Sequence, residues 1–414
     1  MIKNPNLDKK KKIVLIKIIV FCINILYYFF EIKKKFKFIY NKNYELIKLL
    51  YNKININLLI NYVNDCKFLK RINNNNIIKR EHPFLSICIS TYNSEKYIEK
   101  AILSVINQSF QDFEIIVIND NSIDKTYKIL KKLQKEDRRI KIINHSKNLG
   151  TYHSRVEGVI NSKSNYILFL DPDDMIFNQF LFEKVYNCYL NYNLDIIEFT
   201  VFYQKEDINK IYYPINQDLN HYHNYSKKII YQPELSNIIY YKPNSKKYSS
   251  IICRTVWNKI YKRNLVLKSI KYIGDSYYNK YYIIVIEDTI LNTILFNFAE
   301  NYTNINIPGY LYNIRKSSIT RLKKTSDYMK KKSISFFLFF HLLYRHIKEF
   351  DKDRNFLYYE LRIYGYMILK LTKYDKTKYF LNMAKIMIND IINDNKTSKK
   401  FKNYMKWSYK SLLK

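Results

Sequence analysis

The nine residues from Tyr166 to Asp174 constrain the fold of this chain more than any other segment. Five large apolar or aromatic residues, Tyr-Ile-Leu-Phe-Leu, run directly into Asp-Pro-Asp-Asp. A continuous apolar run of this length is typical of a buried strand in a parallel sheet. Open α/β sheets bind ligands outside the carboxyl ends of their strands, so Asp171, Asp173 and Asp174 would face a ligand crevice. Taken alone, the segment fits a solvated acidic turn equally well.

The residues before this segment favour the sheet. Strand patterns alternate with helical patterns, which indicates βαβ units, a largely parallel sheet and the α/β class. Three of the strands end in polar or acidic residues at what would be one edge of the sheet. The predicted strands are residues 84–91, 113–118, 140–143 and 166–170. One helix is predicted at about 95–107, a second follows the capping residue Asp124, and a third runs through Val156 and Val159.

Acidic side chains that meet at one edge predict a metal–diphosphate site. Asp171, Asp173 and Asp174 would repel one another unless a cation neutralised them. Carboxylate oxygens are hard ligands, and they suit Mg²⁺ or Mn²⁺ held by one or two carboxylates together with the phosphates of a substrate.

Five segments resemble family 2 glycosyltransferases, which have the GT-A fold. Each motif is weak alone, but their order over roughly residues 84–200 makes the combination specific. The resemblance implies the transfer of a sugar from a nucleotide sugar, usually a UDP-sugar, to a hydroxyl of a glycan, lipid or protein, with inversion at the anomeric carbon. The segments are Ile87–Glu95 (ICISTYNSE), Ser104–Ser109 (SVINQS), Phe113–Ser122 (FEIIVINDNS), Asn148–Gly150 (NLG) and Phe169–Asp174 (FLDPDD).

The resemblance also implies which residues would bind the nucleotide. Thr91, Tyr92 and Glu95 look like the nucleotide-binding loop. Asp120 looks like the carboxylate that holds the uracil or the ribose. Arg155 lies where a basic residue often helps to hold the nucleotide.

For the metal, Asp171 and Asp173 resemble the DxD pair of the family. Asp173 would be the direct ligand of Mn²⁺ or Mg²⁺, Asp171 would serve both metal and nucleotide, and Asp174 lies beside them. Asn119 departs from the pattern, because the family often has a second Asp there.

An inverting displacement also needs a base that takes the proton of the acceptor hydroxyl. Glu287 and Asp288 end an apolar run and open a helical pattern. An acidic pair is favourable at the start of any helix, so a simple cap would explain it as well. The resemblance implies that Asp288 is the base, with Glu287 in reserve. Trp257, in a segment that resembles the acceptor-side Trp-x-Lys-x-Tyr motif, would stack on an acceptor sugar or lie in the core.

The N-terminus predicts membrane attachment. Residues 13–30 are apolar apart from Lys17 and Asn24, and lysines flank them on both sides. This length is near the lower limit for a membrane span, and an interfacial helix is the alternative. We expect a single-pass anchor whose orientation the equally basic flanks leave undetermined. The expected organisation is an anchor at 1–40, a stalk at 41–82, a GT-A domain at 83–322 with a nucleotide-binding half (83–200) and an acceptor half (201–322), and a helical extension at 323–414.

The net charge of +35 is compatible with several classes of partner. Such an excess would ordinarily suggest nucleic acid or anionic membranes. The chain is rich in Lys, Asn, Ile and Tyr, whose codons are A/T-rich, and it contains no RNA-binding motif or zinc-ligand spacing. We therefore attribute the charge to genome composition and expect no nucleic-acid partner.

Two other functions fit parts of the sequence. A non-catalytic protein on the same fold could bind a sugar nucleotide without transferring it, but such a protein would not need Asp120, Asp171, Asp173 and Asp288 together. A haloacid-dehalogenase-type phosphatase also has Asp-x-Asp after an apolar strand. That family has Thr or Val where this chain has Met175, and its motif lies near the start of its domain.

Overall fold

The computed structural model describes residues 81–205, 210–212, 228–232, 255–274, 287–315 and 379–393, together with residue 235 and single residues between 332 and 349 and between 399 and 406. Contacts divide the chain into two units, Met1–Arg80 and Glu81–Lys414, and all described residues belong to the second. The expected anchor and stalk therefore lie outside the described residues. No helix in the described part of the chain is both long and apolar enough to cross a membrane.

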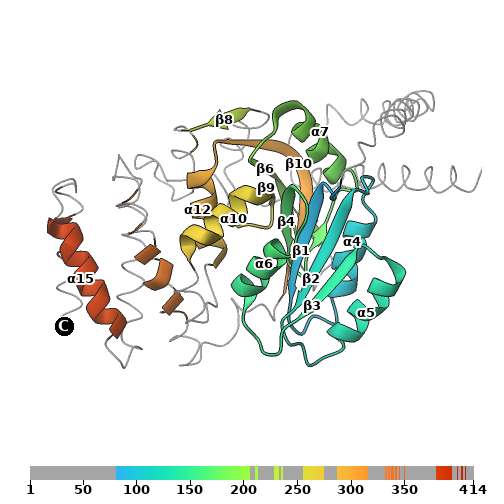
Figure 1. Ribbon diagram of the computed structural model, residues 1–414, viewed down its shortest axis with the longest axis horizontal. Coiled ribbons are helices and arrows are strands. Elements are labelled where there is room, and N and C mark those ends of the chain that lie inside the picture. Colours follow the sequence, from blue (N-terminus) through green and yellow to red (C-terminus); the bar gives the residue numbers. More distant parts are fainter. Residues whose placement is uncertain are drawn as a thin grey trace, which may run out of the picture. The chain divides into compact units, whose positions relative to one another are not determined.

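Four parallel strands form the first half of the sheet, in the order β3-β2-β1-β4 (Figure 1). All residues of β2 and β4 are buried, which explains why these segments, apart from Glu114 and Asn119, are a run of apolar and aromatic residues rather than an alternating pattern. In the register, Thr91 lies opposite Asn119, so β1 and β2 end together. The strands are β1 (Leu85–Thr91), β2 (Phe113–Asn119), β3 (Ile140–Asn144) and β4 (Tyr166–Leu170).

Helices cover both faces of this half, as Figure 1 shows. Apolar residues of α4 (Ile98–Ile106), α5 (Thr126–Glu136) and α7 (Leu181–Tyr192) belong to one core with the strands. On the other face, α6 (Thr151–Ile160) packs against β1 and β2. Gly158 permits this approach, because a Cβ there would lie 3.1 Å from the Cβ of Cys88.

The second half of the sheet is mixed rather than parallel. Strand β9 (Lys259–Lys262) runs antiparallel between β4 and β6 (Ile196–Lys205), and β10 (Asn301–Ile314) pairs in parallel with β6. The order continues β4-β9-β6-β10-β5, with β5 at Met175–Ile176. The short strands β7 (Lys210–Tyr212) and β8 (Ile229–Tyr231) pair with β6 and β10. The expected α/β class is thus confirmed, and the antiparallel strand β9 is the departure from the expected parallel sheet.

Two helices and one long strand bring distant segments to the sheet. Helix α10 (Arg263–Ile273) contacts both α6 and α12 (Glu287–Phe298), which in turn contacts α6. The register of β10 shifts on both sides of Pro308, as expected for a residue that cannot donate to the ladder. In the C-terminal region, where a helical extension was expected, the structure describes helix α15 (Tyr379–Asn393).

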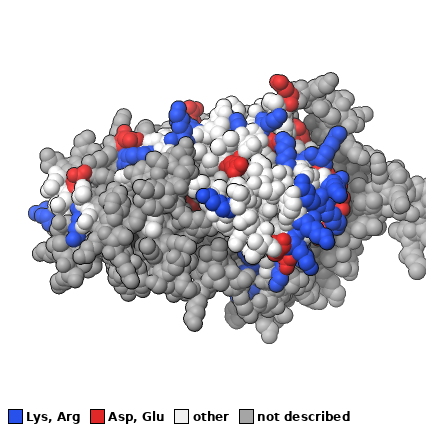
Figure 2. Space-filling model, turned by 60° about the horizontal axis from the view of Figure 1, so that its bottom comes forward, with Lys and Arg blue, Asp and Glu red and all other residues white. Residues whose placement is uncertain are grey.

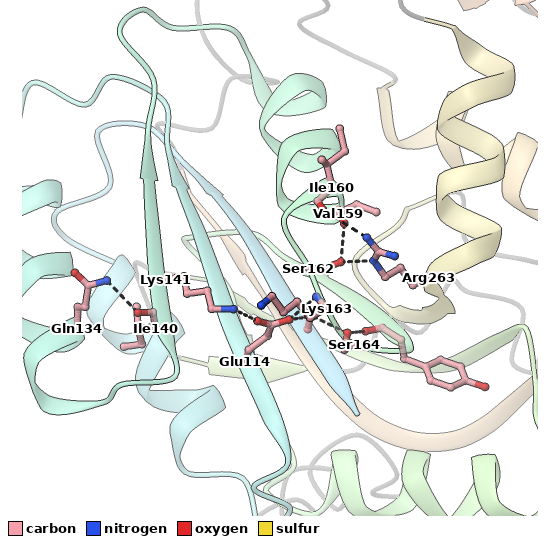
Figure 3. A network of polar contacts seen from close by, with 12 residues as sticks. Glu114, Gln134, Ile140, Lys141, Val159, Ile160, Ser162, Lys163, Ser164 and Arg263 are labelled. Atoms are coloured by element: carbon pink, nitrogen blue, oxygen red, sulfur yellow. Dashed lines mark hydrogen bonds and ion pairs between the residues drawn. The ribbon is translucent and has the colours of Figure 1, made fainter. Parts of the chain in front are cut away.

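At the amino ends of the parallel strands, a polar network surrounds the buried Glu114 (Figure 3). Its carboxylate accepts hydrogen bonds from Ser86 Oγ at 2.6 Å and from the backbone N–H of Lys163 at 2.8 Å, and it pairs with Lys141 at 2.5 Å. Desolvation opposes ionisation, but these contacts outweigh it and lower the pKa of Glu114. The network joins β1, β2 and β3 to the loop before β4, so we regard it as structural.

The outward face of α5 is basic. Lysines and arginines gather on the side of the molecule that carries this helix (Figure 2). Lys132 pairs with Glu99 of α4 at 3.4 Å, but both side chains are largely exposed, so the pair adds little stability. The exposed basic residues here are Lys125, Lys128, Lys131, Lys132, Lys135 and Arg138.

Candidate active site

Two loops that follow β1 and β2 form the first part of the site. We call residues 91–95 and 119–126 the nucleotide-side loops. Thr91 is 1% exposed, and its Oγ1 has no hydrogen-bond partner in the described structure, whereas Tyr92 is 47% exposed. Asn93 adopts a left-handed backbone conformation with φ 49°, which Asn tolerates better than most residues. The loop therefore presents an open aromatic ring beside a buried hydroxyl.

The two nucleotide-side loops are bonded to each other in a reciprocal way. The backbone N–H of Glu95 donates to Asp124 at 3.1 Å, and the N–H of Lys125 donates back to the Glu95 carboxylate at 3.0 Å. The Asn93 side chain accepts the N–H of Ile123 at 2.9 Å. Asp124 also accepts the N–H of Thr126, the first residue of α5, although the N-cap position itself is Lys125, one residue after the capping residue that the sequence predicted. Glu95 thus fixes the loops, and its contact with a nucleotide stays a prediction.

Asp120 points into the fold at the end of β2. It is 2% exposed, and its two oxygens accept the backbone N–H groups of Leu149 and Gly150, both at 2.8 Å. Gly150 has φ 90°, a conformation that favours glycine, and it directly precedes α6. Asp120 therefore positions the start of the helix that carries Arg155. Its predicted contact with uracil or ribose stays a prediction.

His145 lies behind Asp120 and bridges two carboxylates. Its Nδ1 is 2.6 Å from Asp120 Oδ1, and its Nε2 contacts Glu157 on α6. Desolvation of the ring favours the neutral form, but the hydrogen bonds to Asp120 and Glu157 outweigh it and raise the pKa of His145. No sequence motif singled out this histidine, because its partners lie 25 and 12 residues away along the chain.

The Asp-rich turn after β4 is clamped by β10. Asp174 is 1% exposed, and its carboxylate accepts hydrogen bonds from Tyr310 Oη at 2.8 Å and from the N–H of Asn313 at 2.7 Å. Tyr310 Oη also accepts the N–H of Asp171 at 3.2 Å. Both oxygens of Asp174 are thus engaged by the protein, so this residue shapes the turn. Metal binding by Asp174, whose side chain is almost fully buried, stays a prediction.

Asp173 is more accessible than Asp174, and it pairs with Arg315, the residue that directly follows β10. Arg315 pairs with Asp173 Oδ2, and the guanidinium lies over the ring of Tyr97 at 4.7 Å. Desolvation and the nearby Asp171 raise the pKa of Asp173 to about 6, although Arg315 acts in the opposite direction. The carboxylate is therefore costly to ionise in the protein without a further cation.

Arg155 joins the Asp-rich turn to the acidic pair at the start of α12. Its side chain is 5% exposed; Nη2 donates to Asp171 at 2.9 Å, and Nη1 contacts Asp288 and lies 3.7 Å from Glu287. Desolvation would lower the pKa of Arg155, but the three carboxylates outweigh it and raise the pKa. The predicted nucleotide-binding arginine is thus the centre of a carboxylate cluster, which we define as Asp171, Asp173, Asp174, Glu287 and Asp288 with Arg155 and Arg315.

Burial raises the pKa of both members of the acidic pair. Desolvation and the neighbouring Asp288 raise the pKa of Glu287 to about 7. Desolvation also raises the pKa of Asp288, although Arg155 and the backbone N–H of Val256 oppose this. Glu287 and Asp288 open α12, as a helix cap would, but their contacts with Arg155 go beyond capping. A base with a pKa near the working pH suits proton transfer.

The acceptor-side segment is more buried than its predicted role requires. Trp257 is 5% exposed and stacks on Tyr310 and Tyr312, with ring centroids 4.5 Å and 5.4 Å apart. Lys259 is fully buried, with Nζ 3.6 Å from Glu198. These contacts are those of a core, and the stacking of Trp257 on an acceptor sugar stays a prediction.

The donor set fits a hard divalent cation that is shared with a substrate. In the part of the chain that the structure describes, no group of three His, Cys, Asp or Glu residues could hold a metal alone. Asp171 and Asp173 are 26% and 17% exposed at their side chains and belong to one turn. Mg²⁺ is commonly held in this way, by one or two carboxylates and the phosphates of a substrate.

Comparison with known proteins identifies the domain that carries this site. Residues 86–270 match the profile of glycosyl transferase family 2. They form a family 2 glycosyl transferase domain. The match covers the nucleotide-side loops, the Asp-rich turn, Arg155 and Trp257, while Glu287, Asp288 and Arg315 follow it in the chain. Divalent cations are common in this family.

Relatives of the family 2 domain are similar to parts of this chain. Glycosyltransferase GlyA of Streptococcus pneumoniae is 28% identical over 238 residues, which are 58% of this chain and 32% of GlyA. GalNAc(5)-diNAcBac-PP-undecaprenol beta-1,3-glucosyltransferase of Campylobacter jejuni is 41% identical over 93 residues, 22% of this chain and 30% of the relative. The chain thus spans about a third of the length of each. The crystal structure of S. aureus TarS 1-349 in complex with UDP-GlcNAc has a TM-score of 0.47 at 16% identity, and covers 80% of this chain and 88% of that one.

Sequence reasoning missed two residues of the site. These two residues are Arg315 and His145. Arg315 could have been noticed as an arginine directly after a strand that ends at the ligand edge. No comparable signal exists for His145, because only the fold brings it to Asp120.

Proposed function

We propose that this chain is an inverting glycosyltransferase that transfers a sugar from a nucleotide sugar to an acceptor hydroxyl. A UDP-sugar is the donor that we favour. The observation that carries the proposal is the position of Arg155. This one side chain contacts Asp171 of the Asp-rich turn and both members of the acidic pair. Groups suited to a metal–diphosphate and a group suited to proton transfer are therefore neighbours at the carboxyl edge of the sheet.

On the donor side, the exposed ring of Tyr92 offers a surface on which a base can stack. The buried Thr91 Oγ1 lacks a partner and can bond a polar group of the nucleotide. Glu95 and Asp120 hold the surrounding loops in place through the bonds described above. The loops are thus shaped before a nucleotide arrives.

Asp173 and Asp171 would hold Mn²⁺ or Mg²⁺, with Asp174 supporting the turn from behind. When bound, the ion would neutralise the diphosphate and so favour its departure. The protein's own contribution is to fix the turn that carries the two carboxylates: Tyr310 Oη accepts the backbone N–H of Asp171, and Tyr310 and Asn313 donate to Asp174.

On the acceptor side, Asp288 would remove the proton from the attacking hydroxyl while the bond to the diphosphate breaks. Attack from the face opposite the leaving group inverts the anomeric carbon. Arg155 fixes the Asp288 carboxylate, and burial raises the pKa of Asp288, which makes it a better proton acceptor than an ordinary aspartate. Glu287, with a pKa of about 7, is the reserve candidate.

The acceptor is a glycan, lipid or protein. The name of the Campylobacter relative contains a saccharide linked to undecaprenol through PP, which makes a lipid-linked glycan the first acceptor to test. We also propose that residues 13–30 anchor the chain in a membrane. Deletion of residues 1–40 should release a soluble protein that binds nucleotide, and a truncated chain that stays in the membrane fraction would contradict this anchor.

A panel of nucleotide sugars tests the function. The full chain in detergent should hydrolyse one donor in the presence of Mn²⁺ or Mg²⁺ and not in EDTA, and a UDP-sugar should be the best donor. A non-catalytic sugar-nucleotide-binding protein would be stabilised by a donor without ever cleaving it, with or without acceptors. The family match gives no support to the phosphatase alternative, which predicts release of inorganic phosphate from monoesters.

A further inference from the structure

Arg315 pairs with the carboxylate of Asp173, which is the predicted direct ligand of the metal. We propose that Arg315 neutralises Asp173 in the donor-free enzyme and competes there with the divalent cation, so that the metal binds tightly only together with the nucleotide diphosphate. This inference rests on the proposed function and adds a specific role for a residue outside the matched family segment.

The position of Arg315 supports this role. It directly follows β10, and its guanidinium contacts Asp173 Oδ2 on one side and the Tyr97 ring on the other. The two charged side chains are only 21% and 17% exposed, so water screens their attraction weakly. Arg315 is thus a strong local competitor for any cation that approaches Asp173.

The charges around the turn show why the two cations exclude each other. Asp171 is already paired with Arg155, and Asp174 is bonded by neutral donors. A divalent ion at Asp173 beside the guanidinium would place like charges in contact in a poorly solvated site. Binding of the ion to Asp173 therefore weakens the contact between Asp173 and Arg315, and the contact with Arg315 weakens binding of the ion.

Arg315, unlike Arg155, is held loosely enough to exchange. Arg155 contacts three carboxylates from two segments. Arg315 contacts one carboxylate and one ring, and its Nε is buried with no hydrogen-bond partner in the described structure. Leaving this position would cost Arg315 fewer contacts, and the unpaired Nε would gain a partner elsewhere.

A nucleotide diphosphate supplies the partner that the displaced guanidinium needs. Arginine binds phosphate oxygens through parallel hydrogen bonds, which are among the strongest in proteins. A donor that arrives with its metal can thus exchange the Asp173–Arg315 pair for a metal–carboxylate and an arginine–phosphate contact. Metal without nucleotide offers no such exchange, so it must break the pair without compensation.

The test measures Mn²⁺ binding directly, by the loss of the free-ion EPR signal, for the full chain in detergent. Arg315→Gln should bind Mn²⁺ without nucleotide more tightly than the wild type, by about tenfold, which is within the usual range of couplings between sites. With Mn²⁺ saturating, the same variant should bind UDP about tenfold more weakly. Arg315→Lys should lie between the two, and Arg138→Gln, at an exposed arginine before β3, should change neither affinity.

The opposite signs of the two effects separate competition from a structural role. If Arg315→Gln binds Mn²⁺ alone no more tightly than the wild type, or if it weakens both affinities while it unfolds at the wild-type temperature, the competition is refuted. Retention of the tight Mn²⁺ binding after Asp173→Asn is added would also refute it. If no variant binds UDP, the proposed function fails, but the Mn²⁺ measurement still decides the role of Arg315.

Discussion

The nucleotide-side loops and the carboxylate cluster lie at the same edge of the sheet, but they are stabilised in different ways. In the loops, backbone N–H groups satisfy the acidic side chains: Asp124 receives those of Glu95 and Thr126, and Asp120 receives those of Leu149 and Gly150. In the cluster, five carboxylates share two arginines, and one of them, Asp174, is bonded by neutral donors. The acidic side chains of the first region are satisfied without a ligand, whereas those of the second outnumber the positive charges beside them.

The pKa values of two aspartates express this difference. At Asp124 desolvation raises the pKa, but hydrogen bonds from Thr126 and Glu95 outweigh it and the pKa is lowered. At Asp173 desolvation and Asp171 prevail, and the pKa rises to about 6. Ionisation thus stabilises the fold in one region and opposes it in the other. The comparison teaches that hydrogen bonds within the protein satisfy the acidic residues of the loops, whereas a bound cation would relieve the repulsion between the carboxylates of the cluster.

The largest expected effect concerns chemistry in the cluster. Asp288→Asn keeps the size of the side chain but removes its ability to accept a proton. General-base catalysis is typically worth about 10²–10⁴-fold, so turnover should fall by that factor while the affinity for UDP with Mn²⁺ barely changes. Glu287→Gln is the matched variant. A dead Glu287→Gln beside an active Asp288→Asn would make Glu287 the base, and activity in both would reduce the pair to a helix cap.

Removal of Arg155 should have the next largest effect, on stability. Arg155→Gln leaves three buried or half-buried carboxylates without their cation. Breaking a buried ion pair from one side typically costs about 3–5 kcal/mol, so the denaturant midpoint should fall accordingly. Acid should partly restore the variant, because protonation removes the uncompensated charge. A variant as stable as the wild type at pH 8 would show that Arg155 is not the centre of the cluster.

A smaller but sharper contrast comes from two Asp→Asn variants. Asp120→Asn weakens bonds to two N–H groups and to His145, and hydrogen bonds to charged groups are worth about 1.5–3 kcal/mol each. It should lower the free energy of unfolding by an amount in this range. Asp173→Asn should lower it less, because burial and Asp171 already oppose the ionisation of Asp173, which offsets the loss of its contact with Arg315. If urea unfolding gave the same loss of unfolding free energy for both variants, the proposed difference between the two regions would be wrong.

The smallest effect expected depends on pH. The folded state raises the pKa of His145, so the charged ring stabilises the fold most fully below its unfolded pKa of about 6.5. This contribution is lost as the pH rises through the raised, folded-state pKa. The stability difference between wild type and His145→Gln should therefore be largest near pH 6 and shrink at higher pH. A difference that grows with pH would mean that the ring is held neutral between Asp120 and Glu157.

Much of the fold followed from local patterns in the sequence. The continuous apolar runs identified β1, β2, β3 and β4, and the position of Asp124 identified the start of α5, because both signals depend on neighbouring residues alone. The insertion of β9 between β4 and β6 was not predictable in this way. A strand of four residues that pairs antiparallel with two distant segments has no local signature.

The residue types of the site were predictable, but their partners were not. The acidic residues stood out because each ends an apolar run. The contact between Arg155 and Asp288 joins positions 133 residues apart, so spacing along the chain does not reveal it. Asp174 was grouped with Asp173 by sequence, yet Tyr310 and Asn313 of β10 occupy its oxygens. The family resemblance predicted a role for each residue, and the structure showed which charged groups surround it.

The most direct test of the account is thermal unfolding of the wild type and of Asp173→Asn with Mn²⁺ and UDP, added singly and together. A ligand that binds only the native state raises its stability by about 2.7 kcal/mol at a hundredfold excess over Kd. The account predicts a clear rise for the wild type and for Glu136→Gln, an exposed control, only when Mn²⁺ and UDP are both present. Asp173→Asn should show no metal-dependent rise. Full metal-dependent stabilisation of Asp173→Asn by UDP would contradict the assignment of this edge as the nucleotide-sugar site.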